Sequence, residues 1–340
     1  MNFAKMRVAL AQNGILIALV GLIVVFTLMN TRFLSIQNIQ NLVQQSVELG
    51  FIALPLALLI MARGIDLSVG SVASLGAMSA AITMTSTGNW VLGVLVGLVV
   101  GAVAGAVNGY LAAYLGLNPI IVTLGALSVW SGAALMLSDG KTITGLPDAF
   151  KALGQFSVGP IRIQVLLLAV VVVAAWIVLN KTPFGRQLLA VGGNDRAAHL
   201  MGIPVARTRM LLYIVTSVFA AFAGIMLVSK LQAAGPTLGT GLEIQALTVV
   251  LLGGVAMTGG AGRISSVVAG LFFVAVMRNG LVIMGVSQFV QVIITGAVLL
   301  VAIAVDGTIQ RMVRRTWTKV AEDQSETNTA GREEKTSIPA

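Results

Sequence analysis

Long apolar blocks separated by short polar segments dominate this chain and restrict it to one kind of fold. About ten of these blocks approach the ~20 residues that a helix needs to cross the hydrocarbon core of a bilayer. Hydrophobic residues make up 57% of the 340 residues, and charged residues make up 10%. The sequence therefore predicts an all-α integral membrane protein with about ten transmembrane helices. The expected helices cover residues 14–30, 45–63, 68–87, 91–114, 119–137, 161–180, 207–229, 243–258, 265–284 and 288–305.

The charges at the ends of these blocks predict the orientation of the chain. Lys5 and Arg7 precede the first block, but "LMNTRFLS" after it has no small-x-small cleavage site, so we expect a retained helix rather than a signal peptide. With the N-terminus in the cytoplasm, most Lys and Arg residues near span ends fall on the cytoplasmic side. Both termini are therefore predicted to be cytoplasmic. The net charge of +9 is spread over short loops, which argues against a nucleic-acid partner.

Weak internal similarity suggests that the membrane region is a duplication. Residues 15–30 align with residues 165–180, and Asn108-Gly109 recurs as Asn279-Gly280. These matches pair helices of the first half with helices of the second half. We therefore predict an inverted repeat of five helices plus five helices. An odd number of crossings in the first copy places the second copy in the opposite orientation in the bilayer.

The longest predicted cytoplasmic loop, residues 181–209, contains a short helix. Asn194 or Asp195 can cap the start of this helix, "DRAAHLM" favours helix, and Gly202 with Pro204 ends it. We expect a membrane domain over residues 1–312, which includes this loop. The polar segment 313–340 lacks an apolar pattern and is expected to be a disordered cytoplasmic tail.

An aspartate in "GIDLSVGS" (residues 64–71) stands between two apolar blocks and allows two interpretations. Asp66 can be the N-cap of the following helix, neutralised by Arg63 at the inner membrane face. Alternatively, Asp66 and Ser68 belong to a bend that faces a translocation pathway, because ionisable groups within membrane spans are costly and usually functional.

Other polar groups give little indication of chemistry. His199 is the only histidine and there are no cysteines, so no metal site is expected. The segment "GGVAMTGGAGR" (253–263) lacks the lysine of a phosphate-binding loop, and we interpret it as a hinge between helices. Glu48 and Glu243 are expected at outer span ends. The side chains that could line a pathway, or instead form helix-helix hydrogen bonds, are Asn108, Ser128, Trp130, Thr248, Asn279, Gln288 and Gln291.

Four motifs in order resemble the permease subunits of bacterial ABC importers for ribose and related sugars. They are "GIDLSVGS" (64–71), "NGYLAAYLGLNPIIVTLGAL" (108–127), "TPFGRQLLAVGGNDRAAHLMGI" (182–203) and "VVLLGGVAMTGGAGRISSVVAGLF" (249–272). The resemblance extends over about residues 10–310. Arg263 is slightly unusual for the family and puts only that hinge in doubt.

The resemblance implies a type II ABC importer fold in the bacterial inner membrane, with three kinds of protein partner. A cytoplasmic ATPase would bind the ATP, so this chain would itself hold no cofactor. A periplasmic sugar-binding protein would deliver the substrate, and a second permease subunit, identical or a sister, would complete the pore. By position, the coupling helix to the ATPase would comprise Asn194, Asp195, Arg196, Ala197, Ala198, Leu200, Met201 and Gly202. The signature bend would comprise Gly64, Asp66, Ser68 and Gly70.

A self-contained ion-coupled transporter is the alternative function. Such a transporter needs buried carboxylates or histidines that relay protons or sodium ions. Asp66 is the one candidate, and it lies at a span end. An integral membrane enzyme would need convergent acid-base or metal groups, and the sequence does not contain them.

Overall fold

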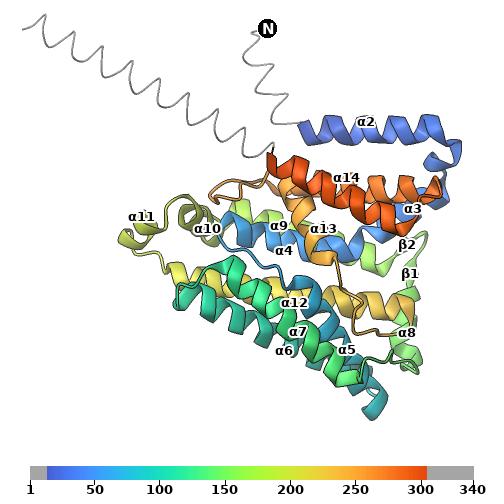
Figure 1. Ribbon diagram of the computed structural model, residues 1–340, viewed down its shortest axis with the longest axis horizontal. Helices are drawn as coiled ribbons and strands as arrows, with labels where there is room; N and C mark the ends of the chain where they lie inside the picture. The colour runs from blue at the N-terminus through green and yellow to red at the C-terminus, as the bar shows by residue number, and fades with distance from the viewer. Residues whose placement is uncertain (1–13, 305–340) are drawn as a thin grey trace, which may run out of the picture. The chain divides into compact units, whose positions relative to one another are not determined.

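The computed structural model describes residues 14–304, and nearly all of the regular structure in this range is helical (Figure 1). The predicted tail, 313–340, lies outside the described residues. Within residues 14–304, the one small sheet is a hairpin in which β1 (Ser157–Val158) pairs antiparallel with β2 (Ile161–Arg162).

The N-terminal part leads into a fully enclosed helix. It comprises α2 (Gly14–Met29), η1 (Thr31–Leu34), α3 (Ile36–Gln45) and α4 (Val47–Met61). Helices α3 and α4 meet at a bend of 43°. Every residue of α4 is buried, including Glu48, so this helix lies at the centre of the bundle.

Glycines hold the next helices close together. These helices are α5 (Val69–Thr87), α6 (Trp90–Gly109), the π-turn η2 (Tyr110–Tyr114) and α7 (Pro119–Ser138). A Cβ atom at Gly101 would lie 2.9 Å from the Ser217 carbonyl oxygen, and one at Gly105 would lie 2.7 Å from the Tyr213 carbonyl oxygen. The glycine stripe of α6 therefore packs against α12 within the same chain, as small residues do between membrane helices.

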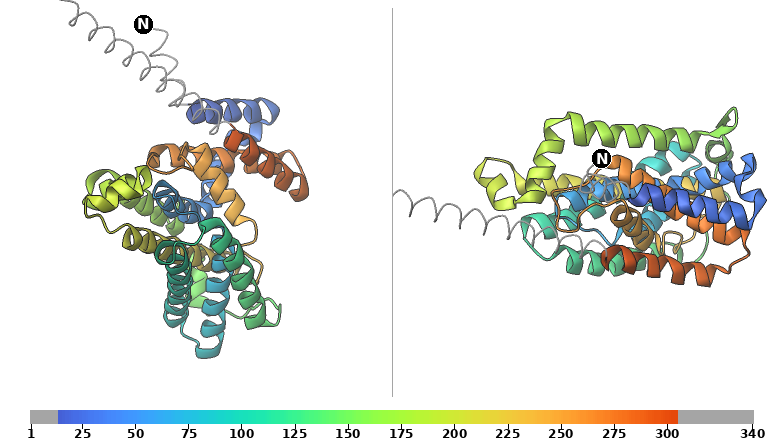
Figure 2. Two further views of the ribbon diagram at one scale, coloured as in Figure 1. Left: turned by 60° about the vertical axis from the view of Figure 1, so that its left-hand side comes forward. Right: turned by 90° about the horizontal axis from the view of Figure 1, so that it is seen from above.

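The second part contains a long central helix and several short ones. Their bounds are α8 (Asp148–Gln155), α9 (Ile163–Lys181), α10 (Pro183–Gly193), α11 (Asp195–Leu200), α12 (Val205–Leu231), α13 (Leu242–Leu252) and α14 (Ile264–Ile283). A further apolar helix covers Gln288–Ala304. Helix α9 runs from the β1–β2 hairpin to α10, so the hairpin and the α10–α11 corner lie at opposite ends of it (Figure 2).

Each of the ten predicted blocks contains a helix, but the helices differ in length. Six are long and apolar enough to cross a membrane among the described residues, or seven if the bent pair α3–α4 is one span. The block 243–258 is helical only to Leu252, because Gly253 and Gly254 end the helix and Gly254 adopts a positive φ of 70°. At 1.5 Å per residue, α13 is only about 16 Å long, too short to cross the bilayer alone. The protein is a helical membrane protein; ten crossings and an inverted repeat stay predictions.

Candidate functional site

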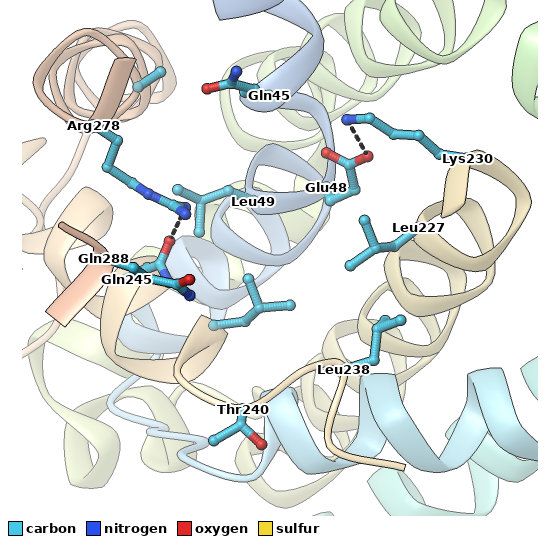
Figure 3. Close-up of a pocket in the computed structure, with 12 residues that line it drawn as sticks. Gln45, Glu48, Leu49, Leu227, Lys230, Leu238, Thr240, Gln245, Arg278 and Gln288 are labelled. Atoms are coloured by element: carbon cyan, nitrogen blue, oxygen red, sulfur yellow. Dashed lines mark hydrogen bonds and ion pairs between the residues drawn. The ribbon is translucent and has the colours of Figure 1, made fainter. Parts of the chain in front are cut away.

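A polar cavity of about 310 Å³ lies between helices that are distant in the sequence (Figure 3). Its lining comes from α3, α4, α12, α13, α14, the helix Gln288–Ala304 and the segment before α13. The lining residues are Gln45, Glu48, Leu49, Leu227, Lys230, Leu238, Thr240, Leu242, Gln245, Ala275, Arg278 and Gln288. The lining therefore combines amides and charged groups with leucines, in a protein whose composition is largely apolar.

The charged groups of the cavity are held by neighbours. The Lys230 ammonium lies 3.2 Å from a carboxylate oxygen of Glu48 and 3.4 Å from the Gln44 carbonyl oxygen. On the other side, the Arg278 guanidinium donates a hydrogen bond to the Gln245 side-chain oxygen (Figure 3). No carboxylate among residues 14–304 forms an ion pair with Arg278 within 4.0 Å. A guanidinium has five N–H donors, so Arg278 keeps donors that a ligand in the cavity can use.

A second hollow continues the polar lining. It has a volume of about 230 Å³ and shares Thr240, Gln245, Arg278 and Gln288 with the first cavity. Its other polar side chains are Gln291 and Thr295, both on the helix Gln288–Ala304. The two hollows therefore share Arg278, and both are lined by amide and hydroxyl side chains.

The structure brings two of the seven predicted pathway residues, Gln288 and Gln291, to these cavities. Thr248 is buried and donates to the Ile244 carbonyl oxygen at 2.7 Å, and Asn279 is paired with Asn38 at 2.9 and 3.0 Å. Ser128 is exposed and Trp130 is half-buried on α7, and the Asn108 amide donates a hydrogen bond to the Ser68 hydroxyl.

Asp66 organises a buried polar bend, and it is not the N-cap that one interpretation predicted. The N-cap of α5 is Ser68. One carboxylate oxygen of Asp66 accepts hydrogen bonds from the Ser68 backbone N–H at 2.8 Å and from the Ser68 hydroxyl at 2.6 Å. The Asn108 amide donates to the Ser68 hydroxyl at 2.8 Å and lies 3.5 Å from the other Asp66 oxygen. This cluster ties the start of α5 to the end of α6.

Arg63 does not neutralise Asp66 as that interpretation expected. Its guanidinium instead bonds the carbonyl oxygens of Gly193 and Thr258. Asp66 lines neither polar cavity, so the alternative pathway role receives no geometric support from them.

Two glycines of the same bend allow close contacts, Gly70 with the start of α13 and Gly64 with α4. A Cβ atom at Gly70 would lie 2.0 Å from a Glu243 carboxylate oxygen and 2.5 Å from the Gly239 carbonyl oxygen. At Gly64 it would lie 2.3 Å from a Leu59 methyl carbon. The predicted bend therefore contacts a segment that borders the cavity.

We expect the Asp66→Asn substitution to change the free energy of unfolding by only about 1 kcal/mol, because the amide oxygen can still accept both Ser68 hydrogen bonds. Asp66→Ala removes the acceptor, leaves the buried Ser68 hydroxyl and Asn108 amide short of partners, and should cost about 1–3 kcal/mol. Thermal unfolding of the two variants in the same detergent measures the difference. Equal destabilisation by the two variants would contradict the hydrogen-bonding role.

The predicted short helix in the longest loop is confirmed as α11. The Asn194 side chain caps it by accepting from the Ala197 N–H at 3.1 Å, and Gly202 ends it with φ of 79°. Ala198 is buried against the bundle, whereas Leu200 and Met201 are 87% and 68% exposed. Arg196, Ala197 and His199 are also exposed. An apolar pair at the tip of a polar helix is typical of a surface that a partner covers.

Ion pairs hold α11 against the bundle. Asp195 lies 3.3 Å from Arg209 and 3.6 Å from Arg63. Partial burial raises the pKa of Asp195, but the positive charges of Arg209 and Arg63 outweigh that effect and hold the pKa below its usual value. A depressed pKa means that these pairs stabilise the fold above about pH 3.9 and lose that effect as the pH falls through the folded-state pKa. They are therefore intact at neutral pH.

The α11 corner and the polar cavity lie far apart along α12. Val205, at the start of α12, lines a hollow with Asn194, Asp195, Arg196, His199 and Leu200, whereas Lys230 near its end lines the cavity. Twenty-five residues of helix separate these positions by about 38 Å, which exceeds the ~30 Å hydrocarbon thickness. The two features therefore belong to opposite membrane faces.

Six helices long and apolar enough to cross a membrane among the described residues, a polar cavity near one end of α12 and an exposed apolar helix tip near the other define a multi-pass helical membrane protein. The chain belongs to the family described as the permease component of the branched-chain amino acid transport system, whose model matches residues 38–303. It is 37% identical over 295 residues to the ribose import permease protein RbsC of Bacillus subtilis (strain 168), covering 86% of this chain and 92% of that protein.

Two further relatives are also named as sugar permeases. The ribose import permease protein RbsC of Escherichia coli (strain K12) is 35% identical over 88% of this chain and 95% of its own length. The L-arabinose transport system permease protein AraH of the same organism is 32% identical over 89% of this chain and 92% of its own length. No solved structure matches the chain significantly.

These relationships establish that the chain is the membrane permease subunit of an ABC importer, a multi-pass protein of the inner membrane. Permease subunits are transport proteins and not enzymes, and ATP hydrolysis belongs to a separate ATPase subunit. An importer of this kind also requires a substrate-binding protein. The resemblance predicted from the four motifs is confirmed, and the ion-coupled alternative is not favoured.

Sequence reasoning missed most of the cavity. The sequence places Glu48 at an outer span end, and neither Lys230 nor Arg278 is among the predicted pathway residues. The available signal was the presence of Gln45, Gln245 and Gln288 within or beside apolar blocks, since amides there are costly unless they have partners.

Proposed function

We propose that the polar cavity is part of the path of a neutral monosaccharide, a pentose such as ribose or a close relative. The observation that carries this proposal is the row of amide and charged groups from Glu48 to Arg278 and Gln288. A sugar hydroxyl both donates and accepts hydrogen bonds, and side-chain amides provide both functions. The cavity volume lies at the lower end of the usual range for small-molecule sites.

The coupling helix to the ATPase is proposed to comprise residues 194–202. Support comes from the exposed Leu200 and Met201 on a short helix that the ion pairs of Asp195 hold in place. ATP is bound by the ATPase subunit, and this chain supplies no cofactor.

The remaining assembly follows the same proposal. A second permease, identical or a sister, completes the pore, and the binding protein approaches the face that carries the cavity. Both termini lie in the cytoplasm, on the face of α11. The permease domain covers residues 1–312 as a ten-helix type II importer built from two inverted halves, with residues 313–340 as a cytoplasmic tail.

Reconstitution of the complete importer tests the proposed substrate. The permease, its ATPase and its binding protein are placed in liposomes, and uptake of radiolabelled ribose, arabinose and a charged amino acid is compared with and without ATP. We expect ATP-dependent uptake of a neutral pentose. Uptake that needs a proton or sodium gradient and no ATP would contradict this proposal.

Removing the free donors of the cavity should impair transport. We expect Arg278→Gln to lower ATP-dependent sugar uptake by about 10-fold, equivalent to about 1.4 kcal/mol, because hydrogen bonds to a charged donor contribute about that much or more. Arg32→Gln is the matched control, since Arg32 is exposed on η1 and does not line the cavity. Similar uptake by both variants, at equal amounts of assembled importer, would exclude Arg278 from the path.

A further inference from the structure

Three segments that are distant in the sequence meet at Arg63. This residue ends the turn after α4 in the left-handed conformation, with φ of 64°. Its side chain donates to the Thr258 carbonyl oxygen at 2.7 Å and to the Gly193 carbonyl oxygen at 2.9 Å. It also lies 3.6 Å from the Asp195 carboxylate. One guanidinium thus joins the end of α4, the α10–α11 corner and the glycine-rich segment 253–263.

The backbones of these three segments touch without side chains between them. The Gly260 N–H donates to the Met61 carbonyl oxygen at 2.8 Å. A Cβ atom at Gly192 would lie 1.7 Å from that same oxygen, and one at Gly260 would lie 2.8 Å from the Gly193 Cα. Backbones packed this closely leave no free space between the three segments. A displacement of one segment therefore displaces the others.

Helix α13 connects this junction to the polar cavity. It ends at Leu252, directly before the glycine-rich segment, and begins at Leu242, which lines the cavity together with Thr240 and Gln245. Its beginning is also fixed to α5, because the Gly239 N–H donates to the Ser74 hydroxyl at 2.8 Å. With a length of about 16 Å, α13 can act as a rigid strut between the two sites.

We propose that Arg63 is a positioning residue that transmits the movement of α11 through the glycine-rich segment and α13 to the sugar cavity. The inference rests on the proposed function of α11 as the coupling helix. Arginine suits this position because its planar fork can bond two carbonyl oxygens and a carboxylate together, whereas a lysine ammonium is a point charge. Loss of the fork would leave α11 able to bind the ATPase while its movement no longer reaches α13.

Two variants of Arg63 separate coupling from folding. Arg63→Gln removes the charge and most of the fork, and Arg63→Lys keeps the charge but loses the fork. Arg186→Gln is the matched control, because Arg186 is an exposed arginine on neighbouring α10. In the reconstituted importer, we expect both Arg63 variants to retain the ATPase subunit and to hydrolyse ATP, with at least a 10-fold higher ratio of ATP hydrolysed to sugar imported. The control should keep the wild-type ratio.

Spin labels follow the movement directly, since the chain contains no cysteine and single sites can be introduced cleanly. Labels at Gln45→Cys and Thr240→Cys report the distance across the cavity, where both side chains are exposed. We expect ATP to change this distance in the wild-type background and to leave it unchanged with Arg63→Gln or Arg63→Lys.

The outcomes distinguish the two proposals. A wild-type ratio and a wild-type ATP-dependent distance change in both Arg63 variants would overturn the role of Arg63. Normal binding of the ATPase when the exposed tip of α11 is altered would instead overturn the coupling assignment on which the inference rests.

Discussion

Replacing Leu200 and Met201 together by aspartate is expected to abolish ATP-driven sugar uptake. The two side chains are 87% and 68% exposed, so the permease does not need them for its own packing. If a cleft of the ATPase covers them, each contributes about 1.5–3 kcal/mol of apolar burial, and losing both weakens the complex by about 100-fold or more. Two buried carboxylates without partners would weaken it further.

Copurification and uptake measure this effect together. The double variant should be recovered from membranes in normal amount, with its melting temperature unchanged, but without the ATPase subunit. The exchange Leu200→Met with Met201→Leu is the matched control, because it keeps apolar volume in both positions and should behave as wild type. Wild-type copurification of the aspartate variant would place the ATPase contact elsewhere.

Local features of the sequence predicted the elements of this fold well. All ten apolar blocks contain helices, because block length and hydropathy are properties of contiguous residues. The same holds for α11, whose Asn194 cap and Gly202 stop lie within one short segment. The glycines of α6 recur at every fourth position, and their contacts with α12 show that this local pattern serves packing within the chain.

Features that depend on distant residues were not predictable in the same way. The cavity combines Glu48, Lys230 and Arg278 from three helices, and no local pattern indicates that these side chains face one another. The Asp66 cluster is similar, because a local pattern that favours an N-cap does not reveal that Asn108 bonds Ser68 from another helix. The local sequence is equally compatible with both interpretations of Asp66, and tertiary contacts decide between them.

The glycine pair Gly192-Gly193 offers a direct test of the junction around Arg63. A Cβ atom at Gly192 would lie 1.7 Å from the Met61 carbonyl oxygen and 2.4 Å from the Gly260 backbone nitrogen. Both are backbone atoms, so no flexible side chain can move aside. We expect Gly192→Ala to force the segments apart, to break the hydrogen bond from Gly260 to Met61 and to destabilise the fold by about 1–3 kcal/mol or more.

Gly193→Ala is the matched control, because nothing lies within 4 Å of a Cβ atom there and the residue does not have a positive φ. This variant should unfold at the wild-type temperature and should transport sugar normally, since its carbonyl oxygen still accepts from Arg63. Thermal unfolding in detergent and ATP-dependent uptake are compared for the two variants. Because a single methyl group differs between neighbouring positions, equal stability and uptake would mean that the three backbones are not in the close contact that couples α11 to α13.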